Sequence, residues 1–135
     1  MSELTLQMAE RAARAAQMRA RELGTPMTVS VVDDGGRLVL CARADDTGFF
    51  TPDTSRAKAV AAAAFRRSTT ELAELAAKGS AFWKTVPAVL EGQALPTPGA
   101  TPITRGGRVI GAIGCGGGTG EQDQQCADAG AAALL

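Results

Sequence analysis

The sequence predicts one α+β domain over residues 1–135, in which helices pack against an antiparallel sheet. The first observation is a repeated hairpin signal, because the segment Val32–Val39 is echoed almost position for position by Ile103–Ile110. The second is that helical segments precede, separate and follow the two hairpins. The third is size, since 135 residues with 45% hydrophobic content suffice for one core.

Helices are predicted from apolar spacing and from end signals. Leu4–Leu23 places its apolar residues mostly four apart and is followed by Gly24, a common helix terminator. Thr51 is expected to cap a helix that has a proline at its first position and continues to Phe65. A capping-box pattern opens another helix over Ser68–Gly79, and a last helix is expected over Glu121–Leu135.

Prolines interrupt the chain between the third predicted helix and the second hairpin. The span Val86–Pro102 contains four of them. Because proline breaks helix hydrogen bonding and is confined to the edges of sheets, this span is predicted to be a surface loop or a short edge strand.

The final strand runs through a glycine loop, residues 114–120, into the last helix. Glycines remove side chains where backbone or ligand must approach closely, so a small guest is expected beside this loop. Thr119 and Gln122 form a predicted capping box at the helix start. Glu121 and Asp123 in the first turn would repel a phosphate there, which argues against a nucleotide site.

Composition excludes several classes of function. Fourteen basic residues balance fourteen acidic ones, so no overall charge favours nucleic acid or an anionic membrane. No stretch approaches the roughly 20 apolar residues of a membrane span, and the charged N-terminal segment is unlike a signal peptide. Three cysteines outside any disulfide framework indicate a reducing cytoplasm. The sequence contains no histidine and no tyrosine.

Four segments resemble the GlcG/HbpS-like haem-degrading family, whose domain also occurs at the C-terminus of PduO-type corrinoid adenosyltransferases. The resemblance covers the chain from about Leu4 onward, and its segments are V-V-D-D-G-G-R-L-V, A-K-A-V-A-A-A-A-F, L-P-T-P-G-A-T-P-I and I-G-A-I-G-C-G-G-G-T-G-E-Q-D. The positions that match the family pattern are Asp33, Gly36, Arg43, Lys58, Pro98, Gly99, Gly114, Gly117, Thr119, Glu121 and Asp123.

This resemblance implies a profilin-like sheet flanked by helices and assembly into homodimers or larger homo-oligomers, with ligand pockets near subunit contacts. It also implies that haem is a possible ligand, although no cofactor is required. The pair Glu71 and Glu74 resembles an iron-binding spacing of the family, but a solvated helix face is the simpler interpretation and no metal site is predicted. Without histidine, haem iron would need a cysteine, methionine, lysine or oxygen ligand, or no strong axial ligand.

The first functional hypothesis is an oligomeric protein that binds a flat apolar ligand such as a porphyrin. Apolar walls with few polar groups suit such a ligand. The predicted ligand-binding residues are Phe49, Phe50, Phe82, Trp83, Cys115, Gly116, Gly117, Gly118 and Thr119.

The second hypothesis is a cofactor-free lyase, isomerase or hydrolase that acts on a small metabolite by acid–base catalysis. Its predicted catalytic residues are Asp33, Arg43, Lys58 and Glu121, with Asp45 and Asp123 as other possible bases. For each residue taken alone, an ion pair on the sheet is the commoner role. Lys58 is expected to keep its ammonium in water, as most lysines do. Cys115 is expected to be a buried filler rather than a nucleophile, since no histidine can activate it.

Overall fold

A computed structural model describes residues 2–135 and confirms the α+β prediction. Over these residues the chain forms a four-stranded antiparallel sheet and five helices. In chain order the elements are α1 (Leu6–Leu23), β1 (Thr28–Asp33), β2 (Leu38–Ala42), α2 (Thr51–Phe65), α3 (Thr69–Ala77), α4 (Ala81–Val89), β3 (Ala100–Arg105), β4 (Arg108–Gly116) and α5 (Gly120–Ala132).

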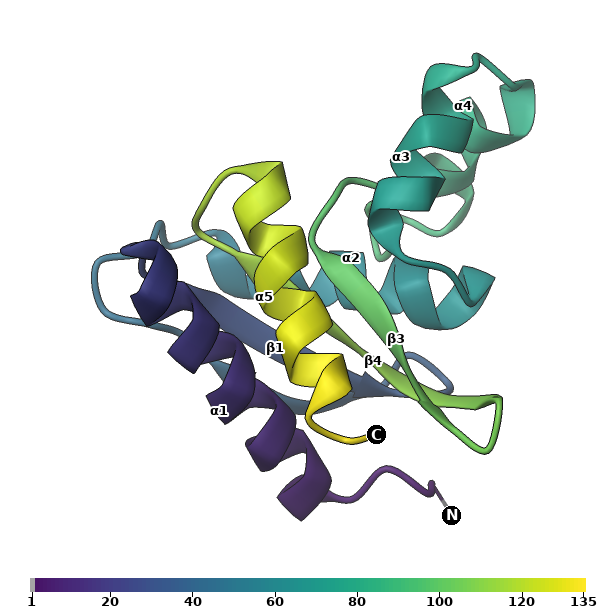
Figure 1. Cartoon of the computed structure of the whole chain (residues 1–135). Helices are drawn as coiled ribbons and strands as arrows, with labels where there is room; N and C mark the ends of the chain where they lie inside the picture. Colours follow the sequence, from purple (N-terminus) through teal and green to yellow (C-terminus); the bar gives the residue numbers. More distant parts are fainter. Residues whose placement is uncertain (1) are drawn as a thin grey trace.

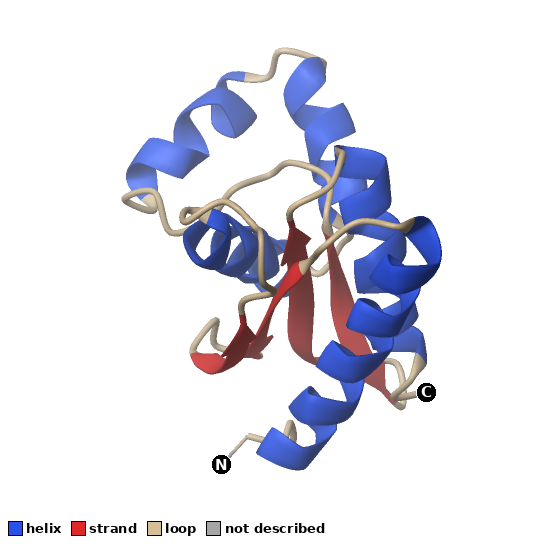
Figure 2. Cartoon of the chain, turned by 90° about the vertical axis from the view of Figure 1, so that its left-hand side faces the viewer, coloured by secondary structure: helices blue, strands red, loops and turns tan. Residues whose placement is uncertain are grey.

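The molecule has three layers, with the sheet between two sets of helices (Figure 1). Helices α1 and α5 lie side by side on one face of the sheet, and α2 lies on the other. Helices α3 and α4 project beyond the sheet from the end of α2 (Figure 1), and Figure 2 shows the same layers from the side. No helix within residues 2–135 is long and apolar enough to cross a bilayer.

Both predicted hairpins form, and they join through their inner strands. The strand order is β2-β1-β4-β3, so β1 and β4 are central and β2 and β3 are the edges. The pairing register places Val29 opposite Cys115 and Val31 opposite Ile113. A one-residue irregularity interrupts each outer pairing, at Val31/Val32 for β2 and at Ile103/Thr104 for β3. The two hairpins therefore share one sheet, as the repeated turn predicts.

Helix boundaries agree with the prediction apart from local shifts. The first helix starts at Leu6 because the Thr5 hydroxyl accepts from a backbone N–H of its first turn. The prediction that Thr51 caps α2 is wrong: Phe50 occupies the N-cap position and its side chain makes no cap bond. The predicted capping box at Thr119 is confirmed, and α5 ends at Ala132 rather than at the chain end.

The prediction for the proline-rich span is wrong in its first part, where the structure forms α4. Ser80 caps this helix by accepting from the backbone N–H of Trp83, and the helix runs nine residues with Pro87 inside it. A proline near the end of a short helix removes only one internal hydrogen bond, so a helix of this length survives. The remaining prolines lie in the loop before β3 and in β3 itself.

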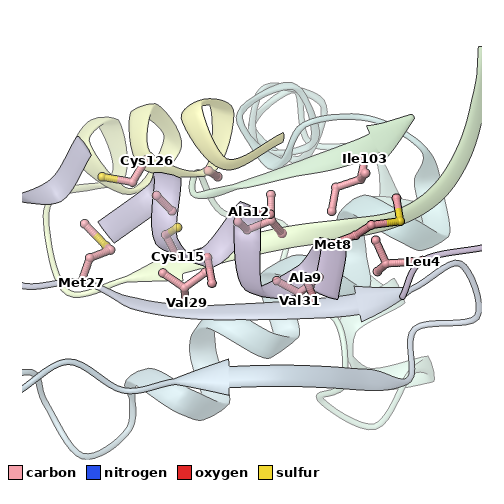
Figure 3. Packing of buried hydrophobic residues seen from close by; sticks show 14 of the residues in the cluster. Leu4, Met8, Ala9, Ala12, Met27, Val29, Val31, Ile103, Cys115 and Cys126 are labelled. Carbon is pink, nitrogen blue, oxygen red and sulfur yellow. The ribbon is translucent and has the colours of Figure 1, made fainter. Parts of the chain in front are cut away.

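The main core lies between the sheet and the pair α1/α5. Small residues of α1 let the helix approach the sheet closely, and larger side chains from the strands fill the space between them (Figure 3). This cluster includes Ala12, Val29, Val31, Ile103, Cys115 and Cys126. A second, smaller cluster joins α2 to the opposite face through Ala59, Ala62, Ala63 and Ala112.

Candidate functional site

Strand β4 carries different residues on its two faces. Ile113 and Cys115 point into the core under α1 and α5. Gly114 lies against α2, where a Cβ would collide with the backbone oxygen of Ser55 and come within 2.8 Å of the backbone nitrogen of Ala59. Glycine at 114 therefore lets α2 pack directly onto the strand.

A hollow of about 310 Å³ opens where β4 passes into the glycine loop. It lies between the first half of α2 and the glycine loop, and residues from other chain segments near the end of β4 complete its lining. The lining residues are Gly48, Phe50, Thr51, Thr54, Lys58, Leu95, Gly116, Gly117, Gly118 and Asp123. The hollow lies directly beside the predicted glycine loop.

A buried ion pair lies at the wall of this hollow. The Lys58 Nζ is 2.9 Å from Asp123 Oδ2 and also donates to the backbone oxygen of Cys115 at 3.1 Å. Lys58 is only 7% exposed, so the expectation that its ammonium stays in water is wrong. A buried ammonium is tolerated here because a carboxylate and a carbonyl compensate for the lost water.

The Asp123 carboxylate also ties down the glycine loop. Its Oδ1 accepts from the backbone N–H of Gly118 at 2.9 Å, while its Oδ2 accepts from Lys58. Burial raises the pKa of the Asp123 carboxyl above its ordinary value of 3.8, because the loss of water outweighs the opposing hydrogen bonds and charge from Lys58 and Gly118. The pair therefore links α2, β4 and the start of α5 at one point.

Buried hydroxyls hold the opposite wall in place. Thr28 of β1 lies 3.0 Å from the Thr47 hydroxyl and accepts from the Thr51 hydroxyl at 2.9 Å. Thr51 lies 2.8 Å from the backbone oxygen of Gly48 as well. These contacts anchor the segment that carries Phe50 to the sheet, so this wall of the hollow is positioned by β1.

The predicted aromatic residues separate into two groups. Phe50 lines the hollow and is 53% exposed, whereas its neighbour Phe49 is 88% exposed and is not part of the lining. Their rings meet edge to face at 5.7 Å. Phe82 and Trp83 instead pack on Phe65, with ring centres at 6.2 and 4.9 Å. The structure therefore brings only Phe50 of the four predicted aromatic residues into the lining.

The predicted residues of the glycine loop lie closer to one another than the predicted aromatic residues do. Gly116, Gly117 and Gly118 all line the hollow, and Thr119 follows them as the cap of α5. Cys115 reaches the region only through its backbone oxygen, because its side chain lies in the core on the other face. The Cys115 side chain is fully buried, as expected of a filler. Burial also raises the pKa of its thiol well above 9.0, with smaller contributions from Cys126 and from Asp123.

Asp33 has a structural role in the first hairpin turn. Its Oδ1 accepts from the backbone N–H groups of Gly35 at 2.9 Å and Arg37 at 3.0 Å, and its Oδ2 accepts from the Arg37 side chain at 3.2 Å. Burial alone would raise the pKa of Asp33, but these hydrogen bonds outweigh it, and the pKa lies below 3.8. The carboxylate is thus stabilised in its charged form, away from the hollow.

Two other predicted catalytic residues lie apart from Lys58. Arg43 lines a separate hollow together with Arg21 near the end of α1. Glu121 is exposed and borders another hollow with Gln124 on α5. Of the four predicted catalytic residues, the hollow beside the glycine loop contains Lys58 alone.

The acidic pair on α3 lies on the surface. Glu71 and Glu74 are both exposed. Within residues 2–135, no group of three or more His, Cys, Asp or Glu residues is arranged to hold a metal ion.

Several lining residues were missed from the sequence. Thr51 and Thr54 are two of them, and they precede the predicted Lys58 at spacings of three and four on α2, which places the three residues on one helix face. That spacing could have indicated a polar stripe. Nothing local marks Gly48 or Leu95, because chain segments distant in sequence bring them to the hollow.

Comparison with known families and proteins agrees with the predicted family. The family model described as haem degrading protein HbpS-like matches residues 4–132. An uncharacterized 15.0 kDa protein from the dhaT-dhaS intergenic region of Citrobacter freundii is 34% identical over 125 residues, which cover 93% of this chain and 87% of that protein. Protein GlcG of Escherichia coli K12 is 35% identical over 111 residues, covering 82% of this chain and 79% of GlcG.

The corrinoid adenosyltransferase PduO of Citrobacter freundii is 30% identical over 131 residues. These cover 97% of this chain but only 39% of PduO, so the similarity concerns less than half of that enzyme.

Solved structures share the fold over almost the whole chain. A crystal structure of HbpS superposes with a TM-score of 0.89 at 34% identity, covering 100% of this chain and 92% of that chain. The complex of PduOC with heme has a TM-score of 0.88 at 30% identity, covering 97% and 94%. The ORFY protein of Klebsiella pneumoniae has a TM-score of 0.90 at 30% identity, covering 97% and 90%. The predicted fold is therefore confirmed.

Proposed function

This chain belongs to the HbpS-like family, and from this premise we propose that it is an oligomeric protein that binds a small ligand beside the glycine loop 114–120. The observation that carries the proposal is the hollow of about 310 Å³, which has a glycine floor and a buried ion pair in its wall. Ligand sites are usually concave and contain a few fixed polar groups among apolar ones. This hollow has that character.

Haem is the ligand that the family description and the heme complex of PduOC favour for this proposal. Phe50 and Leu95 supply apolar surface for a flat ring, and the side-chain-free loop lets the ring approach the backbone. The volume lies at the low end of the range for ligand pockets, so one chain would enclose only part of a porphyrin. The rest of the ring would remain open to water or meet a second copy.

The groups available to haem iron at this site are weak ligands. The chain has no histidine, and the Cys115 thiol lies on the far side of β4. The lining offers the hydroxyls of Thr51 and Thr54 and the already paired Lys58 and Asp123. We therefore expect the ring to be held mainly by apolar contact, which predicts haem bound without two strong axial ligands.

Hemin titration followed by Soret absorbance tests the proposal. The wild-type chain is expected to shift the band and saturate, and Phe50→Ala is expected to weaken hemin about tenfold or more, since burying a phenylalanine contributes roughly 1.5–3 kcal/mol. Phe49→Ala is the matched control, because Phe49 is adjacent, more exposed and outside the lining. Its affinity should equal that of the wild type.

Two results would contradict the proposal. A wild-type titration that shows no saturable change excludes haem as the ligand. Equal losses of hemin affinity in Phe50→Ala and Phe49→Ala would place the ligand elsewhere, because Phe50 lines the hollow and Phe49 does not.

A cofactor-free enzyme is the second candidate, and the buried pair favours it. Lys58 and Asp123 together line the hollow, and burial raises the pKa of Asp123 above 3.8, which makes its carboxylate a stronger base than a solvated one. Deuterium exchange next to the carbonyl of pyruvate, followed by NMR in D2O, tests proton transfer. Exchange that requires Asp123 and survives Glu121→Gln supports this candidate, and exchange no faster than in buffer excludes it for this substrate.

The proposed location is the cytoplasm. All three cysteines are free and two of them are buried, as expected in a reducing compartment.

A further inference from the structure

The two edges of the sheet differ in whether they can accept another strand. An edge strand exposes unpaired backbone N–H and C=O groups, and proteins commonly block it with proline, charge or a covering element. Strand β3 is one edge and β2 is the other.

The β3 edge is blocked at its middle by Pro102. The backbone N–H of Cys115 bonds to the oxygen of Gly99, so alternate residues of β4, including Ile113, direct their N–H toward β3. Pro102 pairs with Ala112, the residue before Ile113, and the N–H of Ala112 points away from β3. The backbone nitrogen of Pro102 therefore faces outward. An outward proline has no N–H to offer a further strand. Helix α5 also packs against β3.

The β2 edge carries a free donor at the corresponding place. The N–H of Asp33 bonds to the oxygen of Arg37, so alternate β1 residues, including Val31, direct their N–H toward β2. Leu40 pairs with Val31, so the backbone N–H and C=O of Leu40 face β1. The backbone N–H and C=O of Cys41, the next residue, therefore face outward. No proline or charged residue lies within Leu38–Ala42.

The side chains of β2 are also incompletely covered. Leu38 is 41% exposed, and the other four residues are half-buried although all are apolar. The strand thus combines an open backbone edge with apolar surface, and such edges favour pairing with another strand.

We propose that β2 pairs antiparallel with β2 of a second copy of this chain, across a two-fold axis near Cys41, so that two sheets join into one. This inference gives the proposed oligomer its interface and does not depend on which ligand binds.

A second copy suits this edge better than an unrelated strand. A strand that pairs antiparallel with its own copy satisfies the two-fold symmetry of most homodimers. The pairing directs the exposed Arg37 of one copy toward the Asp45 end of the other, which brings opposite charges together. The formal net charge of the chain is zero, so two copies do not repel each other overall.

Cysteine cross-linking tests the two-fold axis on the native chain. Cys115 and Cys126 are buried, and only Cys41 is partly exposed. A short bismaleimide is therefore expected to join two chains through Cys41, giving a product of twice the chain mass, and Cys41→Ser should give none. Absence of a cross-linked product from the wild-type chain would overturn the proposal.

A proline at the outward position tests the backbone contact. Cys41→Pro removes the outward donor and copies the arrangement at Pro102, whereas Cys41→Val keeps the donor and serves as the matched control. Light scattering should give the mass of an even number of chains for the wild type and for Cys41→Val. For Cys41→Pro it should give at most half of that mass.

A charge at the edge gives an independent test should the proline variant not fold. Leu38→Lys is expected to halve the mass as well, because a lysine on an edge strand places a charge where a second strand would pair and so disfavours the pairing. Val89→Lys is its control, since Val89 is 73% exposed on α4, a helix that packs on α3. A monomeric wild type, or an unchanged mass in both edge variants, rejects the interface. Failure of hemin binding would leave these masses unchanged, so the two proposals fail separately.

Discussion

The two faces of the central sheet are packed by opposite means. Under α1 and α5, side chains such as Val29, Val31 and Cys115 are fully buried and fill the space (Figure 3). Under α2, Gly114 and Ala59 let backbone meet backbone, and the end of this face opens into the hollow. One face thus supplies most of the apolar burial, while the other leaves a hollow with polar groups in its wall.

Polar burial follows the same division. Ser30 of β1 lies 2.8 Å from Ser55 of α2 on the α2 face, and Lys58 of α2 meets Asp123 of α5 where β4 passes into the glycine loop. Every buried side-chain nitrogen or oxygen within residues 2–135 has a hydrogen-bond partner. Paired groups of this kind tolerate burial but are costly to disrupt singly.

Breaking the buried pair should have the largest effect. Lys58→Met leaves the Asp123 carboxylate buried without its cation and is expected to lower the free energy of unfolding by about 3–5 kcal/mol at neutral pH. Urea denaturation measures the change. Lys84→Met is the control because Lys84 is exposed, and Lys58→Met combined with Asp123→Leu should recover part of the loss. An unchanged midpoint in Lys58→Met would show that the pair contributes nothing.

A cavity on the opposite face should cost somewhat less. Ile113 is fully buried, so Ile113→Ala is expected to lower the unfolding free energy by about 3 kcal/mol, through lost burial and the space left behind. Leu6→Ala, at an exposed position of α1, should change it by less than about 0.5 kcal/mol. Because Ile113 faces away from the hollow, hemin affinity of the folded variant should be unchanged. A large loss of affinity would contradict the separation of the two faces.

A single added methyl group on the α2 face should have a smaller effect on stability. Gly114→Ala forces α2 away from β4 and is expected to cost about 1–3 kcal/mol. Gly35→Ala is the matched control, because its new Cβ would meet side-chain atoms alone, the end of the flexible Arg37 side chain at 3.1 Å and Asp33 Oδ1 at 3.5 Å. Thermal denaturation compares the two variants, and equal melting temperatures would show that the close approach at Gly114 is not required.

Acid titration should separate Asp123 from Asp33 with the smallest effects. The folded-state pKa of Asp123 is raised above 3.8, so its contribution to stability falls as pH rises through the window between 3.8 and the raised value. The folded-state pKa of Asp33 is lowered, so its contribution is present above 3.8 and is lost as pH falls below it.

Urea midpoints measured across the acid range provide the test. Asp123→Asn should remove the decline above 3.8, and Asp33→Asn should remove the loss below it. Identical pH profiles in the two variants would contradict the opposite directions of the two pKa shifts.

Part of the candidate site was predictable because its signals are local. The glycine loop and the capping box at Thr119 are contiguous in sequence, and both occur where predicted. Phe50 was predictable as an aromatic beside a turn, but the same reasoning chose Phe82 and Trp83, which pack on Phe65 instead. Composition identifies an aromatic residue but not the surface on which it packs.

The sequence by itself determined the fold class, the two hairpins, most helix ends and the place of the glycine loop, because hydrophobic period, turn residues and caps act over a few neighbouring residues. Only the tertiary structure decided that Lys58 meets Asp123, 65 positions away, and that the Cys115 thiol faces the core while its carbonyl reaches the lysine. Those contacts depend on the register of β4 between β1 and β3 and on the approach of α2, which no local signal specifies.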